Sequence, residues 1–376
     1  MKIAINTRFL LPRRLEGIGR YTYEVCRRLV EQHPEHEYLF IFDRPYDEQY
    51  IFSDRVQAEI LPPPARHPFL WYFWFEWQLP RLLKRRRAEV FFSPDGFATL
   101  GADVPTVITV HDLAFEEKDN GVPALAGAYY RYFTPRYCVK AAQVVSVSAY
   151  TKQDLQARYD IAADKISVCG NGCRQEVAPL DEAGKAAARA HFNQGQPYFL
   201  YVGAIHPRKN VHRLIEAFSQ FRASTGHEVS LLIAGRFAWK AGPVKAAYER
   251  SGYKDGIKFL GYVPDTELPQ LLGGATSFVY PSLFEGFGLP ILEAMHAEVP
   301  VITSRTTSMP EVAGKAALLV DPTDVSSIAE ALRQLYEQPR LQQQLVAEGQ
   351  QQRKRFSWAH TAEVVHQAIE KAASEQ

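Results

Sequence analysis

The stretch TSFVYPSLFEGFGLPILEAM, residues 276–295, holds a strand, a turn and the start of a helix in close succession. The run TSFVYPS is typical of a buried strand, and Pro290 suits the first turn of a helix. Between them lies Glu285, with Gly286 and Gly288, which lack a Cβ and let a ligand approach the backbone closely. A strand that leads directly into a helix predicts a parallel α/β sheet with this turn at its carboxyl edge.

The same alternation continues on both sides of this stretch. Each half of the chain holds six short apolar runs, most of them continuous rather than alternating, with amphipathic helical segments between many of them. Continuous runs are typical of parallel strands buried on both faces, and 376 residues exceed one ordinary core. We therefore expect an α/β protein with two Rossmann-like doubly wound domains that face each other across a ligand-binding cleft.

The domain boundary is expected in the Ala-, Gly- and Gln-rich segment 174–196, which has no strand signal and is interpreted as a linker followed by a short helix. This gives an N-terminal domain of residues 1–178, a C-terminal domain of residues 179–355 and a final amphipathic helix in 356–376. The formal net charge of +1 and the absence of any apolar run near 20 residues argue against a nucleic-acid partner and a membrane span. We expect a cytoplasmic protein.

The turn after the strand TSFVYPS is the first candidate site. Backbone N–H groups at a helix start attract anions and hydroxyl-rich ligands. Here they belong to Gly286, Phe287, Gly288 and Leu289. Glu293, one turn further on, can accept two hydrogen bonds from the hydroxyls of a ribose. In the alternative interpretation Glu285 caps the helix and Glu293 is merely exposed, but a cap alone does not require two glycines.

A second strand–turn–helix segment, YVGAIHPRKNVHRLIEAF at 201–218, places Arg208 and Lys209 at a helix entrance. Two cations beside a helix N-terminus favour a diphosphate, although an exposed basic turn is the plain alternative. The chain contains no D-x-D motif, which often holds a divalent cation beside a diphosphate, and no Walker A motif. The charge of a bound diphosphate is therefore expected to be neutralised without a metal. We expect neither a metal nor a cofactor.

Two motifs in the first half complete the candidates. GIGRYTYEV, 17–25, has Thr22 where a dinucleotide fingerprint requires glycine, yet amides at Gly17 and Gly19 can still reach a phosphate. The run VITVHDLAF places His111 after a strand, where it can form a hydrogen bond with a reacting hydroxyl or have a purely structural role.

The segment 67–90 is dense in aromatic residues and is followed by basic ones, from Arg81 to Arg87. Aromatic side chains beside Lys and Arg suit the interface of an anionic membrane. A core helix with a solvated basic end fits the pattern equally well.

Taken together, the motifs resemble the retaining glycosyltransferases of family 4, which have the two-domain GT-B fold. The resemblance is carried by EGFGLPILE, GAIHPRKN, GIGRY, TVHDL, SAYTKQDL and FLGYVPDTEL, whose order and spacing cover nearly the whole chain. It implies that the final helix crosses back to the N-terminal domain. It further implies front-face transfer in which the leaving diphosphate takes the acceptor proton.

The resemblance also implies roles for individual residues. Glu293 would bind the ribose and Glu285 the transferred sugar, while Arg208 and Lys209 would hold the diphosphate. His111 would lie beside the sugar C6 hydroxyl or the reacting centre. Amides around Gly17 and Gly19 would close on the phosphates, and the backbone near Tyr262 and Val263 would meet the base. Many members carry Arg where Ala204 stands, which puts more weight on the other two cations.

The motifs HPRKN and EWQLP resemble those of bacterial mannosyl- or rhamnosyltransferases of surface polysaccharide assembly. The expected partners are therefore a nucleotide-sugar donor, with GDP-mannose as the first choice, and a glycan or lipid-linked oligosaccharide acceptor. Two alternatives stay open: a sugar-nucleotide-binding protein without catalysis, and another GT-B enzyme such as a phosphorylase or an epimerase.

Overall fold

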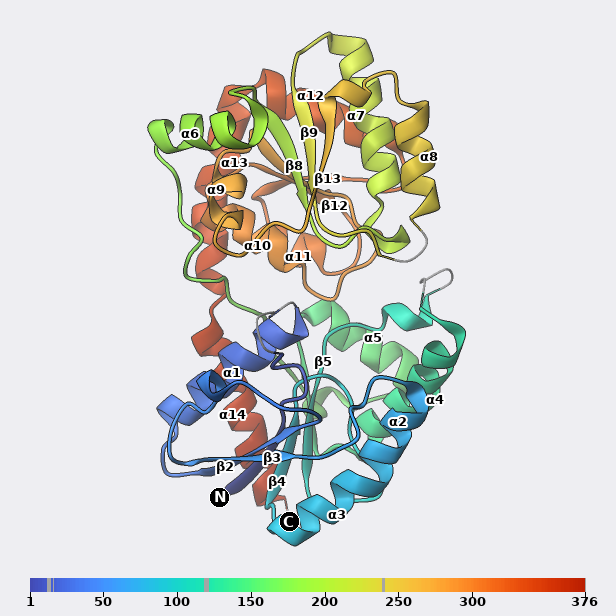
Figure 1. The fold of residues 1–376 in the computed structure, drawn as a ribbon, viewed down its shortest axis with the longest axis vertical. Coiled ribbons are helices and arrows are strands. Elements are labelled where there is room, and N and C mark those ends of the chain that lie inside the picture. Colours follow the sequence, from blue (N-terminus) through green and yellow to red (C-terminus); the bar gives the residue numbers. More distant parts are fainter. Residues whose placement is uncertain (12–14, 16, 118–121, 239–240, 376) are drawn as a thin grey trace. The chain divides into compact units, whose positions relative to one another are not determined.

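A computed structural model describes residues 1–11, 15, 17–117, 122–238 and 241–375. The chain divides into two compact units, residues 1–172 with 357–376 and residues 173–356. Residues 173–178 thus belong to the second unit, although the sequence pattern assigned them to the first. Each sheet has helices along both of its faces, as Figure 1 shows.

The first unit contains a seven-stranded parallel sheet in the order β3-β2-β1-β4-β5-β6-β7. Its strands are β1 (Lys2–Asn6), β2 (Glu37–Phe42), β3 (Val56–Ile60), β4 (Val90–Ser93), β5 (Thr106–Val110), β6 (Gln143–Ser146) and β7 (Ile166–Val168). The helices are α1 (Ile18–Gln32), α2 (Pro68–Phe73), α3 (Leu79–Arg86), α4 (Ala124–Lys140), α5 (Ala149–Tyr159) and α14 (Trp358–Ser374), and a π-helical turn, Trp74–Gln78, joins α2 to α3.

The second unit contains a six-stranded parallel sheet in the order β10-β9-β8-β11-β12-β13. Its strands are β8 (Tyr198–Val202), β9 (Ser230–Ala234), β10 (Ile257–Gly261), β11 (Ser277–Tyr280), β12 (Val301–Ser304) and β13 (Ala317–Val320). Its helices are α6 (Glu182–Asn193), α7 (Val211–Thr225), α8 (Gly242–Arg250), α9 (Leu268–Gly273), α10 (Leu289–His296), α11 (Met309–Ala313), α12 (Val325–Glu337) and α13 (Pro339–Gln352).

The apolar runs of the sequence form the central strands as predicted. Every residue of β5, β9 and β11 is buried, as expected for parallel strands covered on both faces. The sequence analysis missed one strand, β3, because its residues VQAEI are partly polar and partly exposed. Strand β3 lies at the edge of its sheet and has a neighbour only in β2, so it does not need a continuous apolar run.

The last helix, α14, packs on α1 and on β4 to β7 within the first unit. A Cβ at Gly172 would lie 2.4 Å from the backbone nitrogen of Trp358, so the chain passes close to the start of α14 where the two segments of this unit meet. Buried residues of the helix, including Val365 and Ile369, add to the core.

At the carboxyl edge of the second sheet, Gly203, Gly235 and Gly261 end three neighbouring strands, and all three have positive φ. The position of Gly235 is the most restricted, because a Cβ there would lie 1.9 Å from the carbonyl oxygen of Gly203. These glycines keep the backbone free of side chains at the edge where the sequence predicts a ligand site.

Candidate active site

The predicted residues Arg208, Lys209 and Glu285 come together in the second unit. Lys209 Nζ lies 2.6 Å from Glu285 Oε1, and Arg208 Nη1 lies 3.3 Å from Glu285 Oε2. Arg208 Nη1 also donates to the carbonyl oxygen of Phe284 at 2.6 Å. Two motifs that lie 76 residues apart in sequence thus form one ionic cluster at the carboxyl ends of β8 and β11.

Glu285 is buried, and this burial alone would raise its pKa; Lys209 and Arg208 outweigh it and lower the pKa of Glu285 to about 2. The hydroxyl of Tyr280 lies between the two partners, 2.5 Å from Lys209 Nζ and 3.1 Å from Glu285 Oε1. At neutral pH this carboxylate is ionised and cannot donate a proton. Two cations and one anion leave the cluster with one net positive charge.

The turn that carries Glu285 is fixed by hydrogen bonds from the segment after β12. The amide of Glu285 donates to Thr307 Oγ1 at 3.2 Å, and Ser308 Oγ contacts the carbonyl oxygens of Glu285 and Phe287 at 2.9 and 3.0 Å. Gly288, with φ of 100°, then starts α10 without a side-chain cap. The predicted strand–turn–helix is therefore present, and its first helical turn offers backbone N–H groups at a preorganised position.

Glu293 lies in the second turn of α10 and is buried, so it is not the merely exposed acid of the alternative interpretation. Its Oε1 accepts from Arg174 Nε at 2.7 Å, and Arg174 Nη1 lies 3.1 Å from Asp265 Oδ1. The sequence analysis missed Arg174, because it treated 174–196 as a linker with no role in binding. The pair of acids on one guanidinium ties α10 to the loop after β10.

Tyr262 and Val263, the predicted contacts to the base, follow β10 in that same loop, and Tyr262 is exposed. Strands β9 and β8 separate β10 from β11, so these residues lie further along the carboxyl edge than Glu285. Arg174 nevertheless connects this loop to Glu293 through Asp265, two residues beyond Val263.

In the first unit, His111 follows β5, as the sequence predicts. Its Nε2 lies 2.7 Å from the carbonyl oxygen of Pro94, which can only accept, so the proton is on Nε2 and Nδ1 carries the lone pair. Burial lowers the pKa of His111, and the ring packs edge-on against Tyr21 at 4.8 Å between centroids. This histidine is a neutral acceptor with a fixed orientation.

The two predicted glycines at the start of α1 differ in their surroundings. Gly17 is the N-cap residue, with φ of 44° and no neighbour within 4 Å of an added Cβ. Gly19 is buried, and a Cβ there would lie 2.8 Å from the carbonyl oxygen of Phe9. This close approach to the backbone is a structural reason for glycine at position 19, independent of any ligand.

A buried ion pair near His111 was not found from the sequence. Arg8 Nε donates to Asp95 Oδ2 at 2.6 Å, and the guanidinium lies 4.1 Å from the centre of the Phe97 ring. These residues follow β1 and β4, and Asp95 also acts electrostatically on His111. Their position just after two predicted strands was the one available signal.

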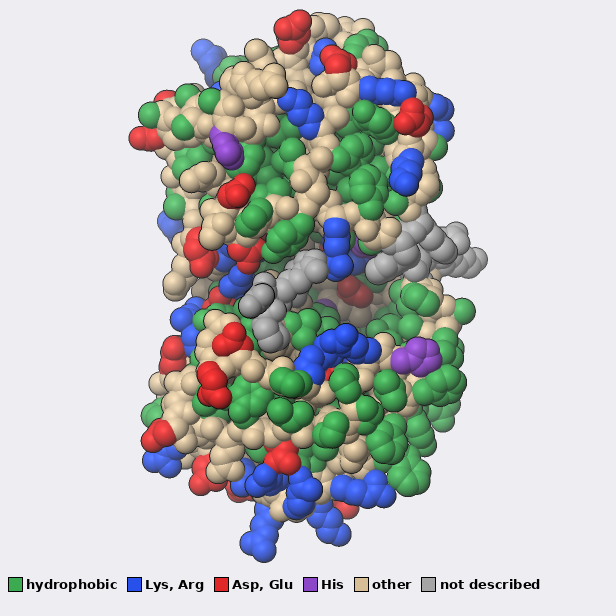
Figure 2. Space-filling view, viewed as in Figure 1, with side chains coloured by type: hydrophobic (Ala, Val, Ile, Leu, Met, Phe, Trp, Pro, Cys, Tyr) green, Lys and Arg blue, Asp and Glu red, His purple; other side chains and the backbone are tan. Residues whose placement is uncertain are grey.

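The aromatic–basic segment divides between the two interpretations. Trp74, Phe75 and the leucines of α3 are buried in the core. By contrast, Phe69 is 71% exposed and Trp77 is 49% exposed, and Arg81 lies over the Trp77 ring. Figure 2 shows hydrophobic side chains gathered over the region of α2 and α4, with Lys and Arg at the end of α3.

Comparison with known proteins identifies the class. The family described as "Glycosyl transferases group 1" matches residues 185–352, and "Glycosyltransferase Family 4" matches residues 15–176. The chain belongs to the glycosyltransferase family whose two halves these descriptions cover, and its two parallel-sheet units are those of the GT-B fold.

Among its relatives is O-antigen chain mannosyltransferase B of Escherichia coli, 30% identical over 361 residues that cover 92% of this chain and 93% of the relative. Another is the O-antigen chain mannosyltransferase RfbU of Salmonella typhimurium, 29% identical over 72% of each chain.

Solved structures agree in fold. WaaG, a glycosyltransferase involved in lipopolysaccharide biosynthesis, superimposes with a TM-score of 0.77 at 17% identity and covers 98% of this chain and 99% of its own. HepE of Anabaena, in complex with UDP and glucose, gives a TM-score of 0.76 at 15% identity, with 98% and 99% coverage. In the part of the chain that the structure describes, none of the helices has the length and apolar character needed to span a bilayer.

Proposed function

We propose that this glycosyltransferase moves mannose from GDP-mannose to a glycan or lipid-linked oligosaccharide, with retention of the anomeric configuration. The choice of sugar is supported by the mannosyltransferase relatives, one of which matches nearly the whole chain. The ionic cluster of Arg208, Lys209 and Glu285 is the observation that carries the proposed mode of transfer.

The donor diphosphate binds at Arg208 and Lys209. Each phosphate oxygen that approaches competes with Glu285 for the same two cations, and the helix start at Gly288 adds backbone donors. As the glycosidic bond breaks, negative charge grows on the leaving diphosphate, and fixed cations in a buried site stabilise it. This arrangement supplies without a metal the charge that other transferases obtain from a divalent cation.

Glu285 acts as a holder of the sugar and of the two cations. With a pKa of about 2 it stays ionised, so it accepts hydrogen bonds from sugar hydroxyls and does not serve as a general acid. Glu293, oriented by Arg174, takes the ribose hydroxyls, and the backbone near Tyr262 and Val263 meets the base. His111 presents Nδ1 as an acceptor to a hydroxyl of the reacting sugars.

The test is transfer from a panel of sugar nucleotides in the presence of EDTA. We expect GDP-mannose to be the preferred donor, and turnover to be unchanged by the chelator. Loss of turnover with EDTA and its recovery with Mg²⁺ or Mn²⁺ would refute the metal-free mechanism. Preference for another donor would refute the choice of sugar.

The alternatives predict other outcomes. A protein that only binds sugar nucleotides would show donor binding by calorimetry without turnover on any acceptor. A phosphorylase of this fold would hold pyridoxal phosphate on a lysine, which absorbs visibly in the purified protein.

We also propose that the exposed aromatic residues of 67–90 contact an anionic membrane, where a lipid-linked acceptor resides. Phe69 and Trp77 offer apolar surface, and Arg81 and Lys84 offer charge for lipid headgroups. The double variant Phe69→Ser and Trp77→Ser should reduce flotation with phosphatidylglycerol vesicles at low salt. Equal flotation of this variant and the parent protein, or no flotation of either, would contradict the proposal.

A further inference from the structure

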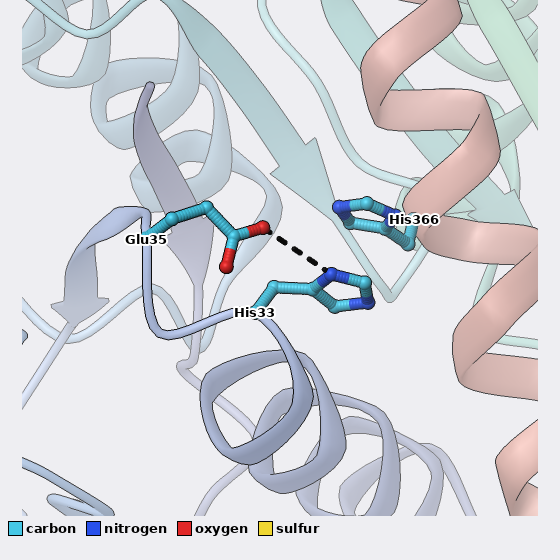
Figure 3. Close-up of side chains that lie close together, drawn as sticks. All are labelled: His33, Glu35 and His366. Atoms are coloured by element: carbon cyan, nitrogen blue, oxygen red, sulfur yellow. Dashed lines mark ion pairs between the residues drawn. The ribbon is translucent and has the colours of Figure 1, made fainter.

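A group of histidines lies where α1 ends, β2 begins and α14 passes. His33 is the C-cap residue of α1, His36 precedes β2 and His366 lies in α14. Glu35 completes the group, and Figure 3 shows its carboxylate directed toward the rings of His33 and His366. The cluster joins residues 330 positions apart in the sequence, and nothing in the transfer reaction described above uses it.

The spacing of the donor atoms is that of a metal site. Glu35 Oε1 lies 3.5 Å from His33 Nδ1 and 3.6 Å from His36 Nε2, and His36 Nε2 lies 3.3 Å from His366 Nε2. Ligands of a tetrahedral zinc ion, at about 2.0–2.1 Å from the metal, lie about 3.3 Å from each other. One atom each from His33, Glu35 and His366 lies within 4.8 Å of the others, which places three candidate donors around one position.

Two imidazole nitrogens meet inside this cluster. The Nε2 atoms of His36 and His366 face each other, and between two neutral imidazoles only one of these nitrogens can carry the shared proton. His36 turns its other nitrogen, Nδ1, toward the N-terminal amine at 3.5 Å. Burial lowers the pKa of His36 and of His366, which keeps lone pairs available at neutral pH. Neutral imidazole is the form that binds a metal.

We propose that His33, Glu35 and His366 bind a divalent transition-metal ion such as Zn²⁺, with His36 Nε2 as the fourth donor. The rings of His33 and His366 are stacked, 3.4 Å between centroids and 10° between planes. Since a metal lies in the plane of each imidazole that it binds, these two rings must rotate as the ion enters. Glu35, whose side chain is 59% exposed, leaves a path from solvent.

The bound ion would fasten α14 to the turn between α1 and β2. A ligand that binds only the folded state raises apparent stability, and this ion would cross-link the two segments of chain that form the first unit. The role is structural and independent of the proposed transfer reaction, so chelation should change stability and leave turnover unchanged.

The experiment is titration of the chelator-treated full-length protein with ZnCl₂ by calorimetry, followed by thermal unfolding with and without Zn²⁺. We expect one equivalent to bind and to raise the melting temperature. His366→Ala should weaken the affinity at least about tenfold and abolish the shift. His360→Ala, an exposed histidine on the same helix, should behave as the parent protein.

Glu35→Gln is the second variant, because its exposed side chain is of similar size and the fold should be retained. It should also weaken Zn²⁺ binding, by several-fold. Absence of binding to the parent protein, or equal affinity in the parent, His366→Ala and Glu35→Gln proteins, would overturn the proposal.

Discussion

Replacement of Lys209 by methionine tests the ionic cluster most directly. Lys209 Nζ lies 2.6 Å from Glu285 Oε1; the side chain of Glu285 is buried, and that of Lys209 is 13% exposed. Removing one partner of a buried ion pair typically costs 3–5 kcal/mol, because the other charge is left uncompensated. Arg208 still faces Oε2 at 3.3 Å, so we expect a cost at the lower end, about 3 kcal/mol.

The pH dependence of stability tests whether Lys209 keeps Glu285 ionised. In the parent protein the lowered pKa of Glu285 contributes stability that is present above about pH 4.5 and is lost as the pH falls toward 2. In Lys209→Met, Arg208 alone opposes the effect of burial, so the pKa of Glu285 rises back toward its ordinary value. The variant should therefore lose less stability than the parent protein as the pH falls from about 4.5 toward 2.

The assay is urea-induced unfolding, followed by circular dichroism, of both single variants and the double variant Lys209→Met with Glu285→Gln. The double variant should be more stable than the sum of the single losses predicts, by about 1–3 kcal/mol. Strictly additive losses, or a Lys209→Met protein that unfolds at the same urea concentration as the parent, would refute the reasoning.

Three further predictions concern other parts of the molecule. Gly235→Ala should abolish soluble expression or lower the melting temperature strongly, because the added Cβ would lie 1.9 Å from a carbonyl oxygen. The control Gly252→Ala, whose Cβ would have no neighbour within 4 Å, should melt like the parent protein, and equal melting temperatures of the two variants would contradict the prediction. Arg174→Met should weaken GDP-mannose binding in calorimetry about tenfold, because Glu293 loses its 2.7 Å partner, and an unchanged affinity would remove Glu293 from the ribose site. Burial lowers the pKa of His366, so the unfolded state binds more protons than the folded state near pH 6. The metal-free protein should therefore lose stability as the pH falls below about 6.5, and in His366→Asn the melting temperature should depend less steeply on pH.

The sequence predicts the central strands well because parallel strands covered on both faces must be apolar throughout. It also predicts that the two motifs ending at Lys209 and Glu285 lie at the carboxyl edge of one sheet. It assigned these residues to separate parts of the donor, however, and their direct pairing depends on strands β8 and β11 being neighbours. Strand order is set by tertiary packing, which local patterns do not encode.

The residues that were missed share one property: their partners are distant in sequence. Arg174 lies in a segment without secondary structure and pairs with Glu293, 119 residues away. Arg8 and Asp95 are separated by 87 residues, and each alone looks like an ordinary charge after a strand. These ion pairs are significant because they are shielded from solvent, and the local sequence around either residue does not show that it is buried.

The first unit consists of two pieces of chain, residues 1–172 and 357–376, and α14 covers α1 and strands β4 to β7. During synthesis, the surfaces that receive this helix are made first and remain uncovered while the entire second unit emerges. Native assembly of the first unit can thus be completed only after the second unit has been synthesised. A premature stop before residue 357 would remove a layer of the interior, and an otherwise intact N-terminal sheet would become a substrate for proteases.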